Sequence, residues 1–280
     1  MKRLCIDFGN ILGKAALAAS VFALFALAPL PSATAATVPS ATQPAADPAL
    51  EAAVKRVLRE NPELVLGVLR ANSEVVLEAA QQGNILRKRK GMLAQWAQDA
   101  KTPKQIAVEE GFSRGAAQAP VTVVAFSDFT CGYCRQAEEA MPALLAKYKG
   151  KVRFVFKPLP KTDSELSYLA ARYCVAAFAQ SEEKGWAYYD ALFAGVEGLV
   201  NQGEGFLKAT GTKVGLDVKR LTADATNKKT EERLGSIRDE AGRLDVHGTP
   251  YFFVNNLVIR GAVSKELFEE AIEMALALKK

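Results

Sequence analysis

The sequence predicts an α/β protein in which a sheet is interrupted by a helical insertion and preceded by an N-terminal α-helical segment. An apolar run at residues 121–126 is typical of a buried strand, and apolar positions at helical spacing follow at residues 135–149. Residues 152–156 alternate between apolar and polar side chains, which indicates a second strand parallel to the first. After a mostly helical block at residues 162–241, the sheet resumes at residues 251–259 with a strand–turn–strand pattern.

Residues 1–35 have the pattern of a secretory signal peptide. Basic residues precede an apolar run at residues 15–30, and Ala33-Thr34-Ala35 offers a small-residue cleavage site. The apolar run is shorter than the roughly 20 residues that span a bilayer, although a retained membrane anchor is the alternative interpretation. Residues 36–46 are rich in Ala, Thr and Pro and predict a flexible lead-in. Both interpretations predict a periplasmic protein.

Residues 47–101 predict helices. Asp47 caps the first helix, Asn61-Pro62 ends it, and a second apolar stripe follows in which Gly83 and Gly91 are weak points. This segment is too small and too elongated to bury its own stripe. We therefore expect the same stripe of another subunit to cover it, which gives a homo-oligomer. Packing onto the following domain is the alternative.

Residues 102–119 contain two glycines and predict a linker with a short hairpin, so the main domain is expected at residues 120–280. Pro142 is expected to kink the helix that follows the first strand. Within the insertion, residues 199–208 predict one helix, and a terminal helix is expected from Ser264 onwards.

Composition limits the chemistry. The 280 residues are 49% hydrophobic with a formal net charge of +5, which is too mild to predict a nucleic-acid or anionic membrane partner. The single histidine, His247, excludes a site built on several histidine ligands and is expected near the site or simply in a loop. Cys5 lies in the expected signal peptide, which leaves the close pair Cys131 and Cys134 and the solitary Cys174. Cys174 lies on a helix face of small residues and is expected to be a buried, inert thiol.

Cys131 and Cys134 have the C-x-x-C spacing of a redox-active dithiol. The strand-to-helix order places Cys131 at the first turn of a helix, where unpaired backbone N–H groups and the helix dipole stabilise a thiolate. We expect Cys131 to be the exposed nucleophile, and Cys134 to be buried and to resolve the mixed disulfide. A structural disulfide is the alternative. A zinc site would need two further ligands that the sequence does not supply, so we expect no metal and no other cofactor.

Two motifs give the sequence a family resemblance. They are Phe126-Ser127-Asp128-Phe129-Thr130-Cys131-Gly132-Tyr133-Cys134 and Gly248-Thr249-Pro250-Tyr251-Phe252-Phe253-Val254-Asn255. In this order they resemble the thioredoxin fold with a helical insertion, as elaborated in the DsbA family, over residues 116–280. The segment around Leu58-Arg59-Glu60-Asn61-Pro62-Glu63 resembles the N-terminal oligomerisation region of ScsC-type proteins. The resemblance implies a thiol–disulfide oxidoreductase or isomerase that acts on exported proteins.

The resemblance also implies roles for the residues around the cysteines. Thr249 and Pro250 would form a loop with a cis peptide bond, which faces the cysteines and offers its backbone to substrate. Gly132 and Tyr133 would tune the redox potential. Since neither is a cation, we expect a pair less oxidising than the most extreme oxidases. The Gly-Tyr dipeptide and Thr249 are similar to those of DsbC-type isomerases.

The sequence departs from the family at Ala125. Many members carry a buried acid at this position, six residues before the nucleophile. The proton relay to Cys134 therefore has no obvious residue. Asp128 is the nearest carboxylate in the sequence, and Lys157 or water are further candidates.

Three functions remain open from the sequence. The first is an oligomeric periplasmic disulfide isomerase that acts on unfolded or misoxidised exported proteins and exchanges electrons with a DsbD-like reductase in the membrane. The second is a monomeric DsbA-like oxidase served by a DsbB-like oxidase. The third, of another class, is a chaperone or a Cu(I)-handling thiol protein, because two thiolates suit Cu(I).

Overall fold

The computed structural model describes residues 47–279, and these divide into two compact units between Gly67 and Val68. The first unit contains α1 (Pro48–Glu60) and the start of α2 (Pro62–Ala71). Asp47 caps α1 by accepting a hydrogen bond from the Ala49 N–H at 2.9 Å, and Asn61 caps its other end. Both helix limits were expected from the sequence. Neither helix has a buried side chain among the described residues.

The second unit begins within α2 and continues into α3 (Ser73–Asp99). The sequence predicted one helix through this region, and that prediction was wrong at Asn72. The Asn72 side-chain amide donates to the Val68 carbonyl at 2.8 Å, which lets asparagine compete with the helical backbone. The expected weak points, Gly83 and Gly91, lie inside an unbroken α3.

The last turn of α3 packs on the edge strand β5 (Leu257–Arg260). Trp96 Nε1 donates to the Val258 carbonyl at 2.7 Å, and the Asp99 carboxylate accepts from the Val258 N–H at 3.0 Å. Two helix side chains thus satisfy backbone groups that an uncovered sheet edge leaves unpaired. Hence the end of the segment predicted as a separate oligomerisation region, residues 47–101, is part of the second unit.

Trp96 provides a prediction about this edge. Trp96→Phe removes the donor and leaves the buried Val258 carbonyl without it, so the free energy of unfolding should fall by about 1–3 kcal/mol in urea titrations. Arg89→Ala is the control, because its ion pair with Glu270 lies in solvent and should contribute less than about 1 kcal/mol. Equal losses in the two variants would contradict the role given to Trp96.

The linker predicted at residues 102–119, with a short hairpin, contains one strand, and this strand pairs with β3 (Val152–Pro158) and not within the linker. A short 3₁₀ helix (Val108–Glu110) leads into β1 (Phe112–Gly115), which pairs antiparallel with β3. β1 has only four residues and no clear alternation. Gly115 at its end has φ +100°, and a Cβ there would come within 2.7 Å of the Val152 carbonyl oxygen.

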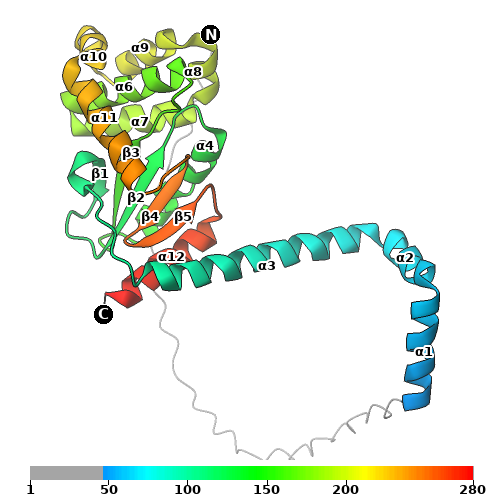
Figure 1. Cartoon of the computed structure of the whole chain (residues 1–280). Helices are drawn as coiled ribbons and strands as arrows, with labels where there is room; N and C mark the ends of the chain where they lie inside the picture. Colours follow the sequence, from blue (N-terminus) through cyan, green and yellow to red (C-terminus); the bar gives the residue numbers. More distant parts are fainter. Residues whose placement is uncertain (1–46, 280) are drawn as a thin grey trace, which may run out of the picture. The chain divides into compact units, whose positions relative to one another are not determined.

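The five-stranded sheet has the order β1-β3-β2-β4-β5 (Figure 1). β2 (Val121–Ser127) is parallel to β3 and antiparallel to β4 (Tyr251–Val254), and β4 forms a hairpin with β5. The parallel pair and the hairpin confirm the predicted strands. Side chains alternate between two faces: Val123 and Ala125 belong to one core cluster, and Val124 and Phe126 to the other.

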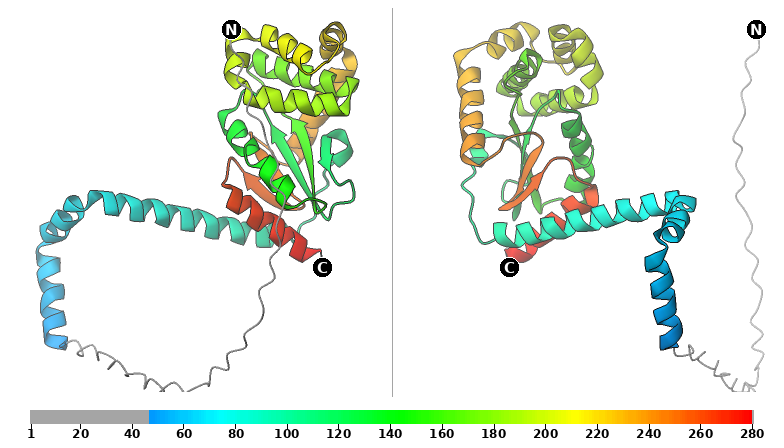
Figure 2. Two further views of the ribbon diagram at one scale, coloured as in Figure 1. Left: turned by 180° about the vertical axis from the view of Figure 1, so that it is seen from behind. Right: turned by 45° about the vertical axis from the view of Figure 1, so that its right-hand side comes forward.

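Helices cover both faces of the sheet (Figures 1 and 2). The larger core cluster lies under α5, α12 and the helical block, and the smaller one lies under α11. The helices of the second unit after β2 are α4 (Gly132–Glu138), α5 (Met141–Lys147), α6 (Glu165–Gln180), α7 (Glu182–Ala194), α8 (Val196–Gln202), α9 (Glu204–Lys213), α10 (Val218–Ala225), α11 (Lys228–Arg243) and α12 (Lys265–Leu278).

Two helix breaks follow from single residues. The helix expected to kink at Pro142 is instead divided into α4 and α5, and Pro142 lies in the first turn of α5. The single helix predicted for residues 199–208 is instead α8 and α9. Gly203 separates them with φ +53°, a conformation that glycine adopts without steric cost. Within residues 47–279, no helix has both the length and the apolar character that a membrane span requires.

Candidate active site

Cys131 lies at the end of the short loop that connects β2 to α4. It is the N-cap residue of α4, with φ −89° and ψ 117°, and its own N–H donates to the Asp128 carbonyl at 3.2 Å. Cys134 follows one turn into the helix. Cys134 is completely buried, as expected, whereas Cys131, which was expected to be exposed, is also buried at 8% exposure and is only the more accessible of the two. Both are free thiols in this structure.

Asp128 fixes the loop that leads to Cys131. One carboxylate oxygen accepts from the N–H and the hydroxyl of Thr130, at 2.7 and 2.9 Å. The other accepts from the Ser167 hydroxyl on α6 at 2.6 Å and from the Lys161 N–H at 3.2 Å. Asp128 is 2% exposed, and these four donors satisfy it. Its carboxylate therefore anchors the loop and is not free to shuttle protons to Cys134.

The loop before β4 brings the second motif to Cys131. The Thr249–Pro250 peptide bond is cis, as the resemblance implied. The Cys131 thiol donates to the Thr249 carbonyl, with 3.6 Å between Sγ and oxygen. Residues 118 positions apart in the sequence thus meet at one sulfur atom. Pro250 is buried and Thr249 is half-buried, so the loop presents backbone next to the nucleophile.

The two cysteines have very different acidities. The thiol of Cys134 donates to Cys131, and backbone N–H groups of Cys134 and Tyr133 point at the same sulfur. Together they lower the pKa of Cys131 to about 5, against an opposing effect of burial. Burial, followed by the hydrogen bond to Cys131, raises the pKa of Cys134 well above its usual value. The pair therefore consists of a ready thiolate and a protonated, sheltered thiol.

This asymmetry has a measurable pH dependence. A thiolate reacts with iodoacetamide and a thiol does not, so alkylation of Cys131 should proceed at its full rate above pH 6 and fall as the pH drops through about 5. Cys134 should stay unmodified over the same range. Mass spectrometry of the alkylated peptides measures both. A midpoint near pH 8.5, the value of a free cysteine, would contradict the stabilised thiolate.

The structure also tests the other residues singled out from the sequence. Gly132 and Tyr133 are exposed, Tyr133 by 70%, beside the sulfur atoms. Ala125 is fully buried on the sheet face of the larger core cluster. Lys157 was a candidate relay, and that interpretation was wrong. It projects from the opposite face of the sheet and forms an ion pair with Glu240 on α11.

His247 and Cys174 do not join the two cysteines. His247 is an exposed loop residue, and its Nε2 lies 2.6 Å from an Asp245 carboxylate oxygen. Cys174 is fully buried on α6, and burial raises its pKa well above the usual value, as expected for an inert thiol. Among residues 47–279, no group of three or more Cys, His, Asp or Glu side chains is placed to hold a metal ion.

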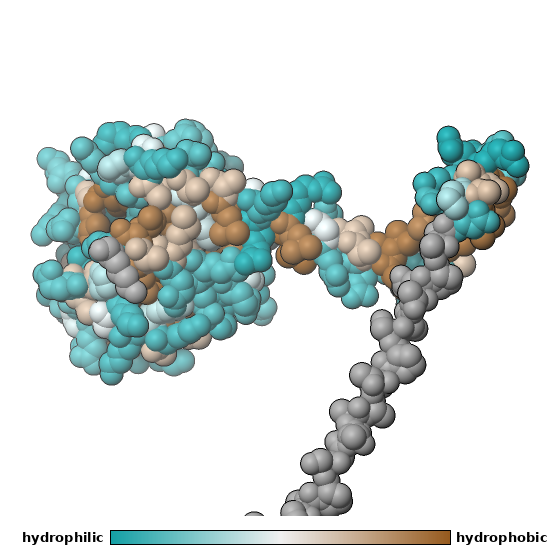
Figure 3. Space-filling model, turned by 90° about the horizontal axis from the view of Figure 1, so that it is seen from below, coloured by the Kyte–Doolittle hydropathy of each residue, from teal (hydrophilic) through white to brown (hydrophobic). Residues whose placement is uncertain are grey.

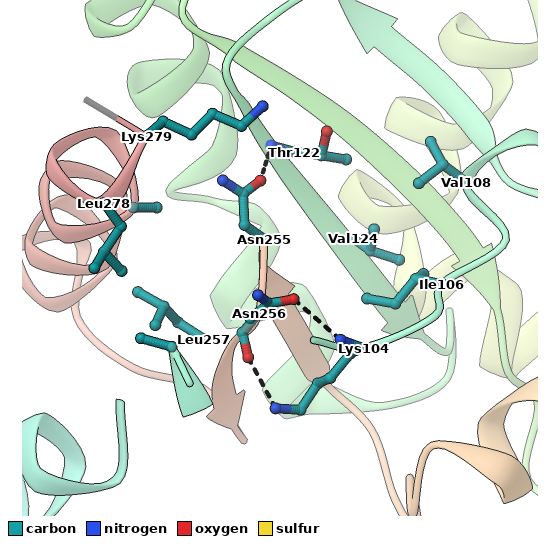
Figure 4. A pocket seen from close by; sticks show the side chains of 12 residues that line it. Lys104, Ile106, Val108, Thr122, Val124, Asn255, Asn256, Leu257, Leu278 and Lys279 are labelled. Atoms are coloured by element: carbon teal, nitrogen blue, oxygen red, sulfur yellow. Dashed lines mark hydrogen bonds between the residues drawn. The ribbon is translucent and has the colours of Figure 1, made fainter. Parts of the chain in front are cut away.

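Two hollows lie at opposite ends of β2. One, of about 530 Å³, adjoins Thr249 and is bordered by Lys161, Arg238 and His247. The other, of about 440 Å³, lies beside the β4–β5 turn, where the Asn255 side chain accepts from the Thr122 N–H and Lys104 contacts Asn256 (Figure 4). Only the first is placed to contact a protein attached to Cys131.

These features define a class of protein: a thiol–disulfide oxidoreductase with a nucleophilic thiolate at a helix N-terminus. Comparison with known sequences agrees. The family model described as Thioredoxin matches residues 107–274, and the chain belongs to the thioredoxin family. The predicted resemblance to thiol–disulfide oxidoreductases is thereby confirmed, as is the thioredoxin fold with its helical insertion.

Named relatives show two contexts for this domain. The chain is 31% identical over 172 residues to the probable disulfide bond formation protein D of Bacillus anthracis, covering 55% of this chain and 77% of that one. It is 34% identical over 165 residues to the Na⁺/H⁺ antiporter NhaA 3 of Salinispora tropica, covering 59% of this chain. The chain spans only 24% of that antiporter, so the match concerns one part of a longer protein.

Solved structures share the fold. A thioredoxin-like oxidoreductase from Silicibacter pomeroyi is 28% identical with a TM-score of 0.54, covering 60% of this chain and 93% of that one. ScsC of Proteus mirabilis, in a transitional conformation, is 19% identical with a TM-score of 0.52. That match covers 82% of this chain and 98% of the ScsC chain, and it shows likeness of fold alone.

Proposed function

We propose that this protein is a periplasmic disulfide isomerase that forms mixed disulfides with unfolded or misoxidised exported proteins. The observation that carries the exchange chemistry is the position of the Cys131 sulfur, 3.6 Å from the Thr249 carbonyl oxygen, together with the lowered pKa of its thiol. A client strand paired with that backbone would bring its own disulfide to the sulfur. Cys134 then resolves the mixed disulfide when the client does not rearrange. A DsbD-like membrane reductase would keep the pair reduced.

The N-terminal helices support an oligomer. Apolar side chains on α1, α2 and the first turns of α3 stay exposed, and Figure 3 shows them as brown patches along these helices. Among the described residues they are Leu50, Val54, Val57, Leu58, Leu64, Val65, Leu66, Val68, Leu69, Val75, Val76 and Leu77. Monomeric proteins rarely expose so many adjacent large apolar side chains. Copies of the same helices in other subunits are the proposed partners, and they would set several active sites around one client.

The test joins function to assembly. Reduced protein should reactivate scrambled ribonuclease, and its native mass should be that of an oligomer. Val65→Glu/Leu69→Glu places charges in the stripe and should lower both the mass and the reactivation. Gln81→Glu, at an exposed polar position of α3, is the matched control and should change neither the mass nor the reactivation. A monomeric protein that reactivates nothing would remove the isomerase proposal.

One observation favours the alternative of a monomeric DsbA-like oxidase. A thiolate whose pKa is lowered to about 5 stabilises the reduced form, and this makes the disulfide more oxidising. A monomer with a potential near that of the strongest oxidases would select this alternative.

The neighbouring thiols Cys131 and Cys134 also leave room for a Cu(I)-handling role. Tight Cu(I) binding without dithiol exchange would select that one.

A further inference from the structure

A third pocket lies beside the active-site helix, between α4, α7 and β1. It has a volume of about 400 Å³. Glu138 of α4 and Asp190 of α7 give it carboxylates, Arg114 of β1 reaches it, and Pro142, Tyr189 and Phe193 form apolar walls. The exchange chemistry described above uses none of these residues.

Glu138 has no partner in this pocket. Glu138 is 6% exposed, and both of its carboxyl oxygens are buried without a hydrogen bond. Its nearest polar neighbour is the Tyr189 hydroxyl, whose hydrogen-bonding interaction lowers the pKa of Glu138, although the two groups do not meet at standard hydrogen-bond geometry. A buried carboxylate without donors is costly, and a native structure usually gives such a group a partner. The position therefore points to a ligand that brings donors into the pocket.

The charges around Glu138 favour a cation. One nitrogen of the Arg114 guanidinium contacts both Asp190 oxygens, at 3.0 and 3.3 Å, and the group stacks over Trp186 at 4.6 Å from the ring centre, while its Nε is buried without a hydrogen-bond partner. Glu139 and Arg135 lie at the rim and offset each other. Burial raises the pKa of Glu138 to about 7, while the Tyr189 hydroxyl and Arg114 act in the opposite direction. Close to neutral pH, a positively charged ligand would favour the ionised carboxylate.

We propose that this pocket receives a basic side chain, lysine or arginine, of the polypeptide engaged at Cys131. The proposal rests on the proposed function, because the occupant is the client. A basic side chain has the required shape, with methylenes that can lie along Pro142 and Phe193 and donors that can pair with Glu138 once its buried carboxylate turns toward the pocket. The pocket would thus select among client segments by their charge.

The spacing predicts where the basic residue lies in the client. Glu138 follows Cys131 by seven residues, which is roughly 10 Å along a helix axis. An extended chain advances about 3.3 Å per residue, so a side chain roughly three residues from the client cysteine would reach the pocket. The experiment below determines whether the basic residue precedes or follows the client cysteine.

The test uses the Cys134→Ser protein, which traps the mixed disulfide. Peptides with the order Lys-Ala-Ala-Cys or Cys-Ala-Ala-Lys are compared with matched peptides in which norleucine replaces lysine. The measured quantity is the equilibrium constant for the mixed disulfide against glutathione. With Glu138 present, one lysine order should be favoured over its norleucine match by about tenfold at pH 8. Glu138→Gln should reduce that ratio to about one, while Glu183→Gln, at an exposed acid of α7 outside the pocket, should preserve it.

A measurement without further substitution guards against a folding defect in Glu138→Gln. In the Cys134→Ser protein with Glu138 intact, the lysine preference should disappear below pH 6, because Glu138 is then protonated. Equal constants for lysine and norleucine in both orders at pH 8 would overturn the basic-residue pocket. A preference that survives Glu138→Gln or low pH would also overturn it. Failure of every peptide to form a mixed disulfide would instead refute the exchange function.

Discussion

Cys131→Ser should lower the rate of thiol–disulfide exchange by about three orders of magnitude or more, because a serine hydroxyl does not attack a disulfide. In the proposed function the sulfur at this position attacks the client, and the Thr249 carbonyl oxygen lies 3.6 Å from it. Serine keeps the size and the N-cap position, so the fold should remain intact. Stopped-flow reduction of a fluorescent peptide disulfide measures the rate.

Cys134→Ser should give a different result. The first attack still occurs, but the buried thiol that releases the client is missing, so a covalent complex at Cys131 should accumulate. Cys174→Ala is the matched control and should retain the full rate, because Cys174 is buried in α6 away from both cysteines. A normal rate in Cys131→Ser, or a lost rate in Cys174→Ala, would mean that the nucleophile has been misassigned.

Lys157→Met should destabilise the protein by about 3–5 kcal/mol, because it leaves a buried carboxylate without its cation. Lys157 and Glu240 form an ion pair in the smaller core cluster, with side chains 0% and 2% exposed. Lys157 also donates to the Ala107 carbonyl at 2.6 Å, and Glu240 accepts from the Ala107 N–H at 2.7 Å. The pair therefore ties α11 to β3 and to the segment before β1. Urea titration measures the loss.

The double variant Lys157→Met/Glu240→Gln separates charge from packing. Glutamine keeps an acceptor for the Ala107 N–H but carries no charge, so most of the lost stability should return. Glutathione exchange by Cys131 should stay near its normal rate in the double variant, because the pair lies on the face of the sheet opposite α4. A double variant as unstable as Lys157→Met would show that packing, not the unpaired charge, causes the loss.

The sequence predicted the core of the site because its signals are local. The apolar run of β2, the C-x-x-C spacing and the start of α4 are adjacent, and together they place Cys131 at a helix N-terminus. The contact between Thr249 and Cys131 has no local signal in the sequence, because the two residues are 118 positions apart. Its motif lies beyond the whole helical insertion, and only the family resemblance linked the two.

The features that sequence reasoning missed depend on contacts between distant residues. β1 is four residues long and gains its strand pairing from β3, so it has no periodicity of its own to detect. Trp96 and Asp99 continue a helical pattern, and nothing in that pattern shows that they cap β5. Lys157 and Glu240 are 83 residues apart, and charged residues at such spacing usually indicate solvent.

Single polar residues were the hardest to interpret. Asp128 was weighed as a proton carrier, but its position two residues before Thr130 is that of a side chain that closes a turn, a signal the sequence did contain. Glu138 follows the helical pattern of α4 as an ordinary acid. Only the packing of α7 against α4 reveals that it is buried and unpaired.

A redox titration with glutathione tests the central claim most directly. The claim is that Cys131 and Cys134 interconvert between dithiol and disulfide as a unit. Full-length protein equilibrated at graded ratios of reduced to oxidised glutathione, quenched with acid and analysed by mass spectrometry, should show one cooperative two-electron transition. The oxidised product should link Cys131 to Cys134 and leave Cys174 as a thiol. A pair that never joins, or a bond that involves Cys174, would contradict the account.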